Sequence, residues 1–381
     1  MMNVEKIRKD FPIFEKKKFI YFDNACMPLR PKVVIDKINE YYTEYPACAG
    51  RSYHDFGTRL TDEVANARDL VKKFIGAKKA KEIIFTKNAT ESINLVANSF
   101  KFNSVLTSDR EHNSNLLPWQ KFDHDVVKSK KDFSFDLESF SDKVKNFDIV
   151  SMVHTSNLEG YSLPVKEIIK IAHEQGAKVL LDGAQSVPHK EINVRKLDVD
   201  FLAFSGHKML GPNGVGVLYG KEELLDGMKP FILGGETVSD STYDSYKLEE
   251  LPHKFEAGLQ NYPGILGLGS AAKYLMKIGR NNIEKHENML KSKIDIEGVE
   301  KIGHVGESGI FNFNIPGKGA HEVAMMLSAS KNIMIRSGAH CMHSWFNSRN
   351  LEGSARASFY LYNTLEEIDT FVEELEKIKK L

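Results

Sequence analysis

The sequence predicts an α/β protein with a largely parallel sheet in a large domain, followed by a smaller α+β domain. Short apolar, β-rich runs alternate with amphipathic helical stretches over most of the chain, which is typical of strand–helix units. This alternation of strands and helices changes beyond residue 268. A chain of 381 residues is long enough for one large and one smaller domain. We expect residues 16–265 to form the large domain, and residues 1–15 to pack with residues 266–381 in the small one.

Apolar runs mark the strands of the large domain, and helical periodicity marks its helices. We expect helices at 58–77 (TRLTDEVANARDLVKKFIGA) and 163–177 (LPVKEIIKIAHEQGA). The expected strands lie at 82–86, 104–108, 148–156, 178–184, 200–205 and 214–220. In the small domain, we expect a helical stretch over 268–294, a strand over 308–317 and an amphipathic helix over 364–381.

Composition excludes several classes of protein. Lys plus Arg and Asp plus Glu number 52 each, so no basic surface for nucleic acid or membranes is predicted. No apolar run is long enough to cross a bilayer, and the charged start lacks a signal-peptide core. Three cysteines, an odd number, favour a reducing compartment over a disulfide framework, so we expect a cytoplasmic protein.

Polar residues follow three of the expected strands, at the sheet edge where such folds bind ligands. After 82–86 a helix begins at Ala89 and Thr90, and the free N–H groups at its N-terminus could bind an anion. The alternative is that Asn88 or Thr90 simply caps the helix. Asp182 lies near the end of 178–184 and Gln185 directly follows this run. A buried acid there is costly unless it pairs with a cation, and a salt bridge or a cap is the alternative.

A lysine follows the third of these strands, on a tight connection between two apolar runs. Ser205, His207 and Lys208 lie in "SGHKMLGP", where Gly206 and Gly211 allow the backbone to approach closely. Lysine is almost never fully buried without a partner, so we expect Lys208 to be a functional residue.

One ligand needs an anion site, an acid and a lysine together. Pyridoxal phosphate carries a phosphate, a pyridine nitrogen that an acid keeps protonated, and an aldehyde that forms a Schiff base with lysine. A stacking group or base over its ring is also needed, and His112 in "EHNSN" supplies one. The sequence therefore predicts a pyridoxal 5'-phosphate site at Lys208.

Over nearly its whole length the chain resembles the class V aminotransferase family of fold-type I enzymes, within it the SufS-like cysteine desulfurases and selenocysteine lyases. The motifs that carry the resemblance occur in family order: "EHNSN", "HTSNLEG", "LDGAQS", "SGHKMLGP", "KFEAG", "RSGAHC" and "SARASFYLYNT". The resemblance implies a seven-stranded, mostly parallel sheet and a homodimer in which each subunit completes the other's active site.

The resemblance also assigns roles to residues. Lys208 matches the Schiff-base lysine, Asp182 the acid at the pyridine nitrogen, and His112 the histidine over the ring. The other matches are Gln185 at the ring hydroxyl, Thr90 with Ala89, Ser205 and His207 at the phosphate, Arg356 and Asn157 at the substrate carboxylate, and Cys341 as the sulfur acceptor.

The implied reaction releases L-alanine from L-cysteine and leaves a persulfide on Cys341 for an unidentified acceptor, as in iron–sulfur cluster or thio-cofactor synthesis. The thiolate needs cationic neighbours to lower its pKa, and Arg336, His340 and His343 are the nearest candidates in the sequence. Selenocysteine lyase, another class V enzyme, a plain transaminase and a metal or iron–sulfur protein remain alternatives.

The chain departs from the family in two places. Leu259 replaces a threonine that, in the family, reaches the cofactor phosphate in the partner subunit. The loss of this hydrogen bond should weaken cofactor binding by about 1 kcal/mol. Cys26 and Cys48 lie in segments that line the substrate end in the family. They are expected either to fill space or, with Cys341, to handle sulfur or bind metal, with His54 or a partner-subunit residue as a further ligand.

Overall fold

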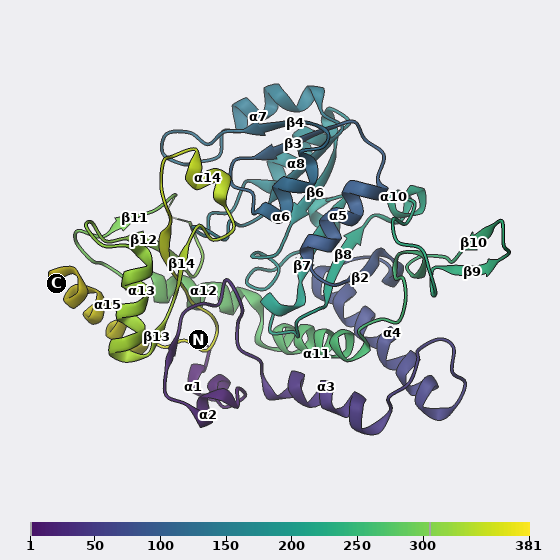
Figure 1. Cartoon of the computed structure of the whole chain (residues 1–381), viewed down its shortest axis with the longest axis horizontal. Helices are drawn as coiled ribbons and strands as arrows, with labels where there is room; N and C mark the ends of the chain where they lie inside the picture. Colours follow the sequence, from purple (N-terminus) through teal and green to yellow (C-terminus); the bar gives the residue numbers. More distant parts are fainter. Residues whose placement is uncertain (1, 305) are drawn as a thin grey trace.

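A seven-stranded sheet lies at the centre of the large domain in the computed structural model, which describes residues 2–304 and 306–381 (Figure 1). The strand order is β2-β8-β7-β6-β5-β3-β4. The bounds are β2 (Ile83–Thr86), β3 (Ser104–Ser108), β4 (Asp123–Val127), β5 (Ile149–Val153), β6 (Lys178–Asp182), β7 (Phe201–Ser205) and β8 (Gly216–Gly220). Only β8 runs antiparallel to its neighbours, so the predicted α/β fold with a mostly parallel sheet is confirmed.

The six apolar runs contain the strands predicted from them, and the seventh strand, β4, was missed. β4 is an edge strand whose residues alternate between exposed and half-buried, so it lacks the continuous apolar run of a central strand. In the parallel centre of the sheet Val153 pairs with Asp182, and Asp182 with Ala203. This register brings the carboxyl ends of β5, β6 and β7 to one edge.

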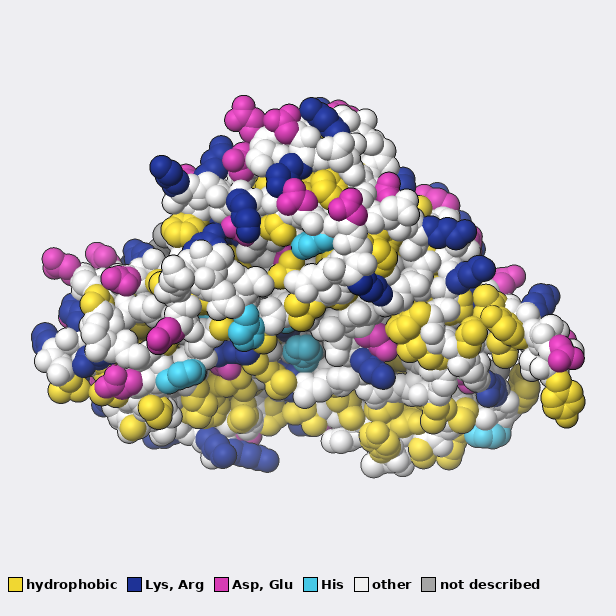
Figure 2. Space-filling view, turned by 45° about the horizontal axis from the view of Figure 1, so that its top comes forward, with side chains coloured by type: hydrophobic (Ala, Val, Ile, Leu, Met, Phe, Trp, Pro, Cys, Tyr) yellow, Lys and Arg dark blue, Asp and Glu magenta, His cyan; other side chains and the backbone are white. Residues whose placement is uncertain are grey.

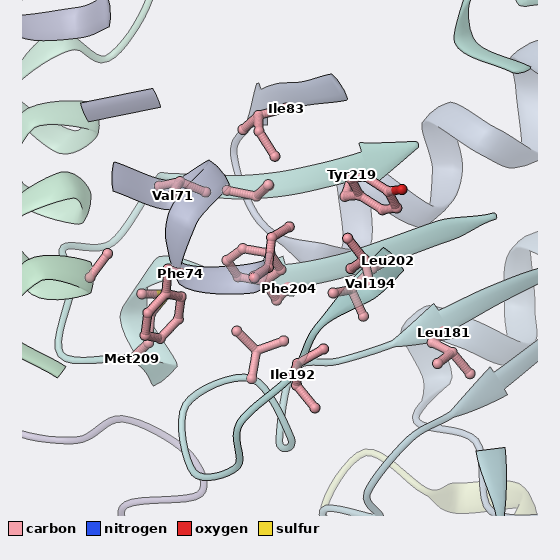
Figure 3. Close-up of a cluster of buried hydrophobic side chains, with 14 of the residues drawn as sticks. Val71, Phe74, Ile83, Leu181, Ile192, Val194, Leu202, Phe204, Met209 and Tyr219 are labelled. Atoms are coloured by element: carbon pink, nitrogen blue, oxygen red, sulfur yellow. The ribbon is translucent and has the colours of Figure 1, made fainter. Parts of the chain in front are cut away.

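Helices cover both faces of the sheet, which is why its strands are apolar throughout. One face packs on α3 (Lys32–Glu44), α4 (Asp55–Ile75), α8 (Val165–Glu174) and α11 (Tyr262–Ile278), and the other on α5 (Ala89–Ser99). Figure 3 shows part of the first core, where Val71 and Phe74 of α4 face Leu202 and Phe204 of β7. The neighbouring residue Ala203 faces the second core, with α5.

The small domain is built on a four-stranded antiparallel sheet of order β11-β12-β15-β14. Its elements are β11 (Glu300–Lys301), β12 (Ile310–Asn314), β14 (Arg336–Gly338), β15 (Ser354–Ser358), α12 (Arg280–Lys291), α13 (Ala320–Lys331) and α15 (Leu365–Lys380). The segment around Ile20 joins this domain, because β1 (Ile20–Tyr21) pairs in parallel with β13 (Ile333–Met334), whereas Ile7 and Phe11 pack in the core of the large domain.

The helical stretch predicted over 268–294 is two helices rather than one. α11 ends at Ile278 and α12 begins at Arg280, and Gly279 between them has φ of 84°, a left-handed value that ends a helix. α11 packs in the core of the large domain, whereas Leu290 of α12 packs in the core of the small one. The domain division stays a prediction, and this packing favours a boundary within α12.

Short elements complete the chain. They are α1 (Val4–Arg8), α2 (Ile13–Lys16), α6 (Asn113–Leu116), α7 (Leu137–Lys143), α9 (Val194–Leu197), α10 (Glu222–Gly227), α14 (His343–Asn347), β9 (Val238–Ser241) and β10 (Tyr246–Leu248). Among the described residues, no helix combines the length and the apolar character needed to span a membrane.

Candidate active site

A cavity of about 230 Å³ lies at the carboxyl ends of β5, β6 and β7, between the two domains. It brings together most of the residues predicted to form the site: Cys26, Ala89, Thr90, His112, Asn157, Asp182, Gln185, Ser205, His207, Lys208 and Arg356. A larger hollow of about 970 Å³ between α3, α4 and α11 contains none of them. The smaller cavity is therefore the candidate active site.

Lys208 ends a single helical turn that begins at Gly206, directly after β7. The turn needs glycine, because a Cβ on Gly206 would lie 2.8 Å from the carbonyl oxygen of Val215, and one on Gly211 2.9 Å from that of Gly206. Burial lowers the pKa of Lys208, and Asp182 opposes this shift. A lowered pKa favours the neutral amine, the form that attacks an aldehyde.

Asp182 lies at the end of β6 with 3% of its surface exposed. Its Oδ1 accepts a hydrogen bond of 2.9 Å from the N–H of Ala184, and within the described residues it forms no salt bridge. Burial raises the pKa of Asp182, while Lys208 lowers it. The simple salt-bridge alternative is therefore not supported, and this carboxylate remains free to stabilise a cation that enters the cavity.

Gln185 links the site to the start of the chain. Its Nε2 donates to the carbonyl oxygen of Ala25 at 2.7 Å, which fixes the backbone next to Cys26. The turn that contains Cys26 is held a second time, because the N–H of Ala25 donates to Ser358 Oγ at 2.9 Å.

His112 caps the short helix α6, and its ring lines the cavity. The N–H of Ser114 donates to His112 Nδ1 at 3.1 Å, which assigns the proton of the neutral ring to Nε2. Burial, with the positive charges of Lys208, Arg336 and Arg356, lowers the pKa of His112 to about 3. The ring is therefore uncharged near neutral pH.

Glu111, directly before His112, was not predicted as part of the site. It is buried under the cavity, where it accepts hydrogen bonds from Asn115 Nδ2 at 2.6 Å and from the N–H of Val153 at 3.1 Å. Burial raises the pKa of Glu111 to about 8. These bonds connect the loop that carries His112 to β5, so Glu111 positions the histidine.

The N-terminus of α5 forms the end of the cavity that suits an anion. Asn88 caps the helix through the N–H of Glu91 at 3.0 Å, as the capping alternative predicted. Thr90, Ser205 and His207 also line the cavity here, and the N–H of Ala89 donates to Ser205 Oγ at 2.9 Å. Capping and anion binding are thus compatible at this helix end.

Arg356 of β15 is 1% exposed and has unused hydrogen-bond donors. Its Nη1 donates to the carbonyl oxygen of Asn157 at 2.7 Å, and its Nη2 lies 3.6 Å from Asp23 Oδ1. Its Nε and Nη2 have no hydrogen-bond partner among the described residues, and neither has Oδ1 of Asn157. Two unsatisfied nitrogens of a buried guanidinium suit a carboxylate.

Asp23 is a second residue that sequence reasoning missed. Burial raises its pKa, and the nearby guanidinium groups of Arg356 and Arg336 lower it. The signal was present in "YFDNAC", where Asp23 precedes Cys26, but its partner Arg356 lies far along the sequence.

Arg336 of β14 donates hydrogen bonds to two of the three thiols. Its Nη1 donates to Cys26 Sγ at 3.0 Å and its Nη2 to Cys341 Sγ at 3.7 Å. Among the three candidate cations, only Arg336 hydrogen-bonds to a thiol. Burial lowers the pKa of His340 to about 2, so this ring is neutral, and His343 Nδ1 lies 2.9 Å from Asn113 Nδ2 instead.

Cys48 and Leu259 lie outside the cavity of the single chain. His54, proposed as a further metal ligand, caps α4 through the N–H of Gly57 at 3.3 Å. Across residues 2–304 and 306–381, no group of three or more His, Cys, Asp or Glu side chains has a metal-binding arrangement. Of the three thiols, only Cys26 lines the cavity within the described residues, and Cys341 lies next to it on Arg336, so the convergence of all three thiols on one pocket stays a prediction.

Comparison with known proteins gives consistent matches. The model of the family "Aminotransferase class-V" matches residues 20–371. A protein of Halalkalibacterium halodurans named "Probable cysteine desulfurase" is 40% identical, over 100% of this chain and 98% of its own. The apo structure of cysteine desulfurase from Thermococcus onnurineus NA1 has a TM-score of 0.94 and 39% identity, covering 100% of this chain and 98% of that one. The cysteine desulfurase CsdA of Escherichia coli has a TM-score of 0.90 and 29% identity, covering 99% and 98%.

Proposed function

The chain belongs to the class V aminotransferase family and to its pyridoxal-phosphate-dependent cysteine desulfurases, and we propose that it moves sulfur from L-cysteine to Cys341. The resemblance stated from the sequence, the fold class and the cofactor are thereby confirmed. The roles of individual residues are proposals, and the geometry of the cavity supports them.

The donor set of the cavity fits pyridoxal phosphate. The N-terminus of α5 with Thr90, Ser205 and His207 would hold the phosphate, and Asp182 would pair with the pyridine nitrogen. Lys208 would bind the aldehyde carbon, and His112 and Gln185 would contact the ring and its hydroxyl. When bound, the cofactor supplies an electron sink for negative charge at the Cα of an amino acid.

Arg356 would bind the carboxylate of L-cysteine through its free Nε and Nη2, because both nitrogens are buried and unsatisfied. Asn157 holds the guanidinium in place through its backbone oxygen. The Nζ of Lys208, whose pKa burial lowers, would take the proton from Cα of the substrate.

Cys341 would take the sulfur as a thiolate. Its Sγ attacks the sulfur of the substrate, an S–S bond forms, the Cβ–S bond breaks, and the electron pair goes to Cβ, which is then protonated to give L-alanine. Arg336 stabilises the attacking thiolate by its hydrogen bond to Sγ. A transaminase does not need this thiol, so the Arg336–Cys341 contact is the observation that carries the proposal.

The test measures L-alanine and sulfide formed from L-cysteine in the presence of a reductant. Cys341→Ser should keep bound cofactor and lose sulfide formation, and borohydride should fix the cofactor to the peptide that contains Lys208. A Cys341→Ser protein with full activity would refute the assignment of Cys341. Comparing kcat/KM for L-cysteine and L-selenocysteine distinguishes a desulfurase from a selenocysteine lyase.

We also propose that the chain forms a homodimer and acts in the cytoplasm, with a protein as its sulfur acceptor. Large apolar side chains are exposed next to Leu259, at Phe231 and Ile232, and also at Leu233, Tyr53 and Phe56, the last at the start of α4. Figure 2 shows hydrophobic side chains gathered on the side of the molecule that carries the β9–β10 hairpin. Such a patch is typical of an interface.

Light scattering during gel filtration tests the dimer. Ile232→Asp should shift the protein toward the monomer, while Lys73→Asp, on the exposed side of α4, should leave the dimer intact. A wild-type protein that stays monomeric at all concentrations would refute the proposal.

A further inference from the structure

One guanidinium group holds two thiols at the cavity, although the proposed reaction uses only one of them. Arg336 Nη1 donates to Cys26 Sγ at 3.0 Å, the shorter of its two contacts, and Nη2 donates to Cys341 Sγ at 3.7 Å. Because both nitrogens belong to one guanidinium group, the two sulfur atoms lie close to each other in the structure.

Cys26 is the thiol that lines the cavity. It lines the cavity together with Lys208 and Arg356, whereas Cys341 does not. Its backbone is fixed, since the N–H of Cys26 donates to the carbonyl oxygen of Asp23 at 3.1 Å and the preceding carbonyl accepts from Gln185. A residue that only filled space would not need its sulfur placed on a guanidinium.

The charge on Arg336 suits a negative sulfur at either position. Burial acts to lower the pKa of Arg336, but Cys26, Cys341 and Asp23 outweigh burial and raise it. The guanidinium group donates a hydrogen bond to each sulfur, so it can stabilise a negative charge at either position.

We propose that Cys26 is a second sulfur-accepting residue, which takes the sulfane sulfur from the persulfide on Cys341. The inference rests on the proposed role of Cys341. The Cys26 thiolate attacks the outer sulfur of the Cys341 persulfide, a new S–S bond forms at Cys26, and the old S–S bond breaks. The electron pair of that bond stays on Cys341, which leaves as a thiolate, so the step needs no oxidant or reductant.

The relay frees Cys341 for a second turnover, which makes it measurable without a reductant. The holoenzyme is mixed with excess L-cysteine, quenched with an alkylating reagent and assayed for L-alanine. The wild type should release a burst of about two L-alanine per subunit, and Cys26→Ala and Cys26→Ser about one. Cys48→Ser is the matched control and should keep the wild-type burst, because Cys48 lies outside the cavity.

Mass spectrometry of the same samples locates the sulfur independently of turnover. Trypsin separates the three cysteines, because Lys and Arg residues divide them among different peptides. An added sulfur should appear on the Cys341 peptide first and on the Cys26 peptide second, and the Cys48 peptide should remain unmodified. In Cys341→Ser, the signal on the Cys26 peptide should fall at least about tenfold.

Three results would overturn the relay: a burst near one in wild type and Cys26→Ala alike, a Cys26 peptide without added sulfur, or equal labelling of Cys26 in Cys341→Ser. Failure of the proposed function is a different result, because no L-alanine would form and neither peptide would gain sulfur.

Discussion

Replacing Arg356 by alanine tests how the site binds its substrate. The side chain is buried and its Nη1 is bound to Asn157, while its Nε and Nη2 form no hydrogen bond within the described residues, although Nη2 lies 3.6 Å from Asp23 Oδ1. A substrate carboxylate would gain two charge-assisted hydrogen bonds from these free nitrogens. Their loss should cost about 2–3 kcal/mol, which corresponds to a roughly 30- to 150-fold weaker binding of L-cysteine.

The assay is a titration of the bound cofactor's absorbance, which measures the dissociation constant rather than KM. Cysteamine, which is cysteine without its carboxylate, provides the control on the substrate side. The wild type should bind cysteamine about as weakly as Arg356→Ala binds L-cysteine, and the variant should bind both compounds alike. An equal loss of affinity for both compounds would refute the carboxylate contact and leave Arg356 with a structural role toward Asn157.

Three further predictions concern the sulfur acceptor and the stability of the fold. Cys341→Ser should keep the spectrum of bound cofactor and its response to L-cysteine but form sulfide at least about a hundredfold more slowly, and normal sulfide formation would contradict the mechanism. Glu256→Ala should lower the free energy of unfolding in urea by about 3–5 kcal/mol, because Arg68 then stays buried without its two bonds of 2.7 and 2.8 Å to this carboxylate. Glu222→Ala, which removes two surface ion pairs with Lys79 and Lys81, should change the free energy of unfolding far less, and equal effects of the two substitutions would contradict this reasoning. Burial lowers the pKa of His154 from 6.5 to about 3, so below pH 6.5 the unfolded chain binds a proton that the folded chain does not. His154 should therefore contribute a fall in stability of roughly 1.4 kcal/mol for each pH unit from 6.5 toward 3, and urea unfolding of His154→Asn should show a slope shallower by that amount; a slope equal to that of the wild type would refute this.

The sequence was sufficient where a local pattern determines structure. Six strands were predicted because both faces of the sheet are covered, which leaves an uninterrupted apolar run in each. The positions of Lys208, Asp182 and Thr90 followed from the same runs, since the carboxyl ends of neighbouring strands meet at one edge. β4 escaped because it lies at the sheet edge, where alternate residues face solvent.

The rest of the site depends on contacts between distant parts of the chain. Asp23 meets Arg356, and Cys26 meets Arg336, across more than 300 residues. No local pattern records these pairs. For the same reason, the sequence did not reveal that Cys48 lies outside the cavity, although its sequence setting resembles that of Cys26.

The parallel pairing of β1 with β13 has a consequence for the synthesis of the protein. A ribosome makes Cys26 early, but the strand that fixes its segment contains Ile333 and Met334, and Arg356 follows later still. The sheet that presents Lys208 and Asp182 is complete by Gly220. A nascent chain therefore contains the residues proposed to hold the cofactor before it contains Arg336, Cys341 and Arg356, which are proposed to act on the amino acid.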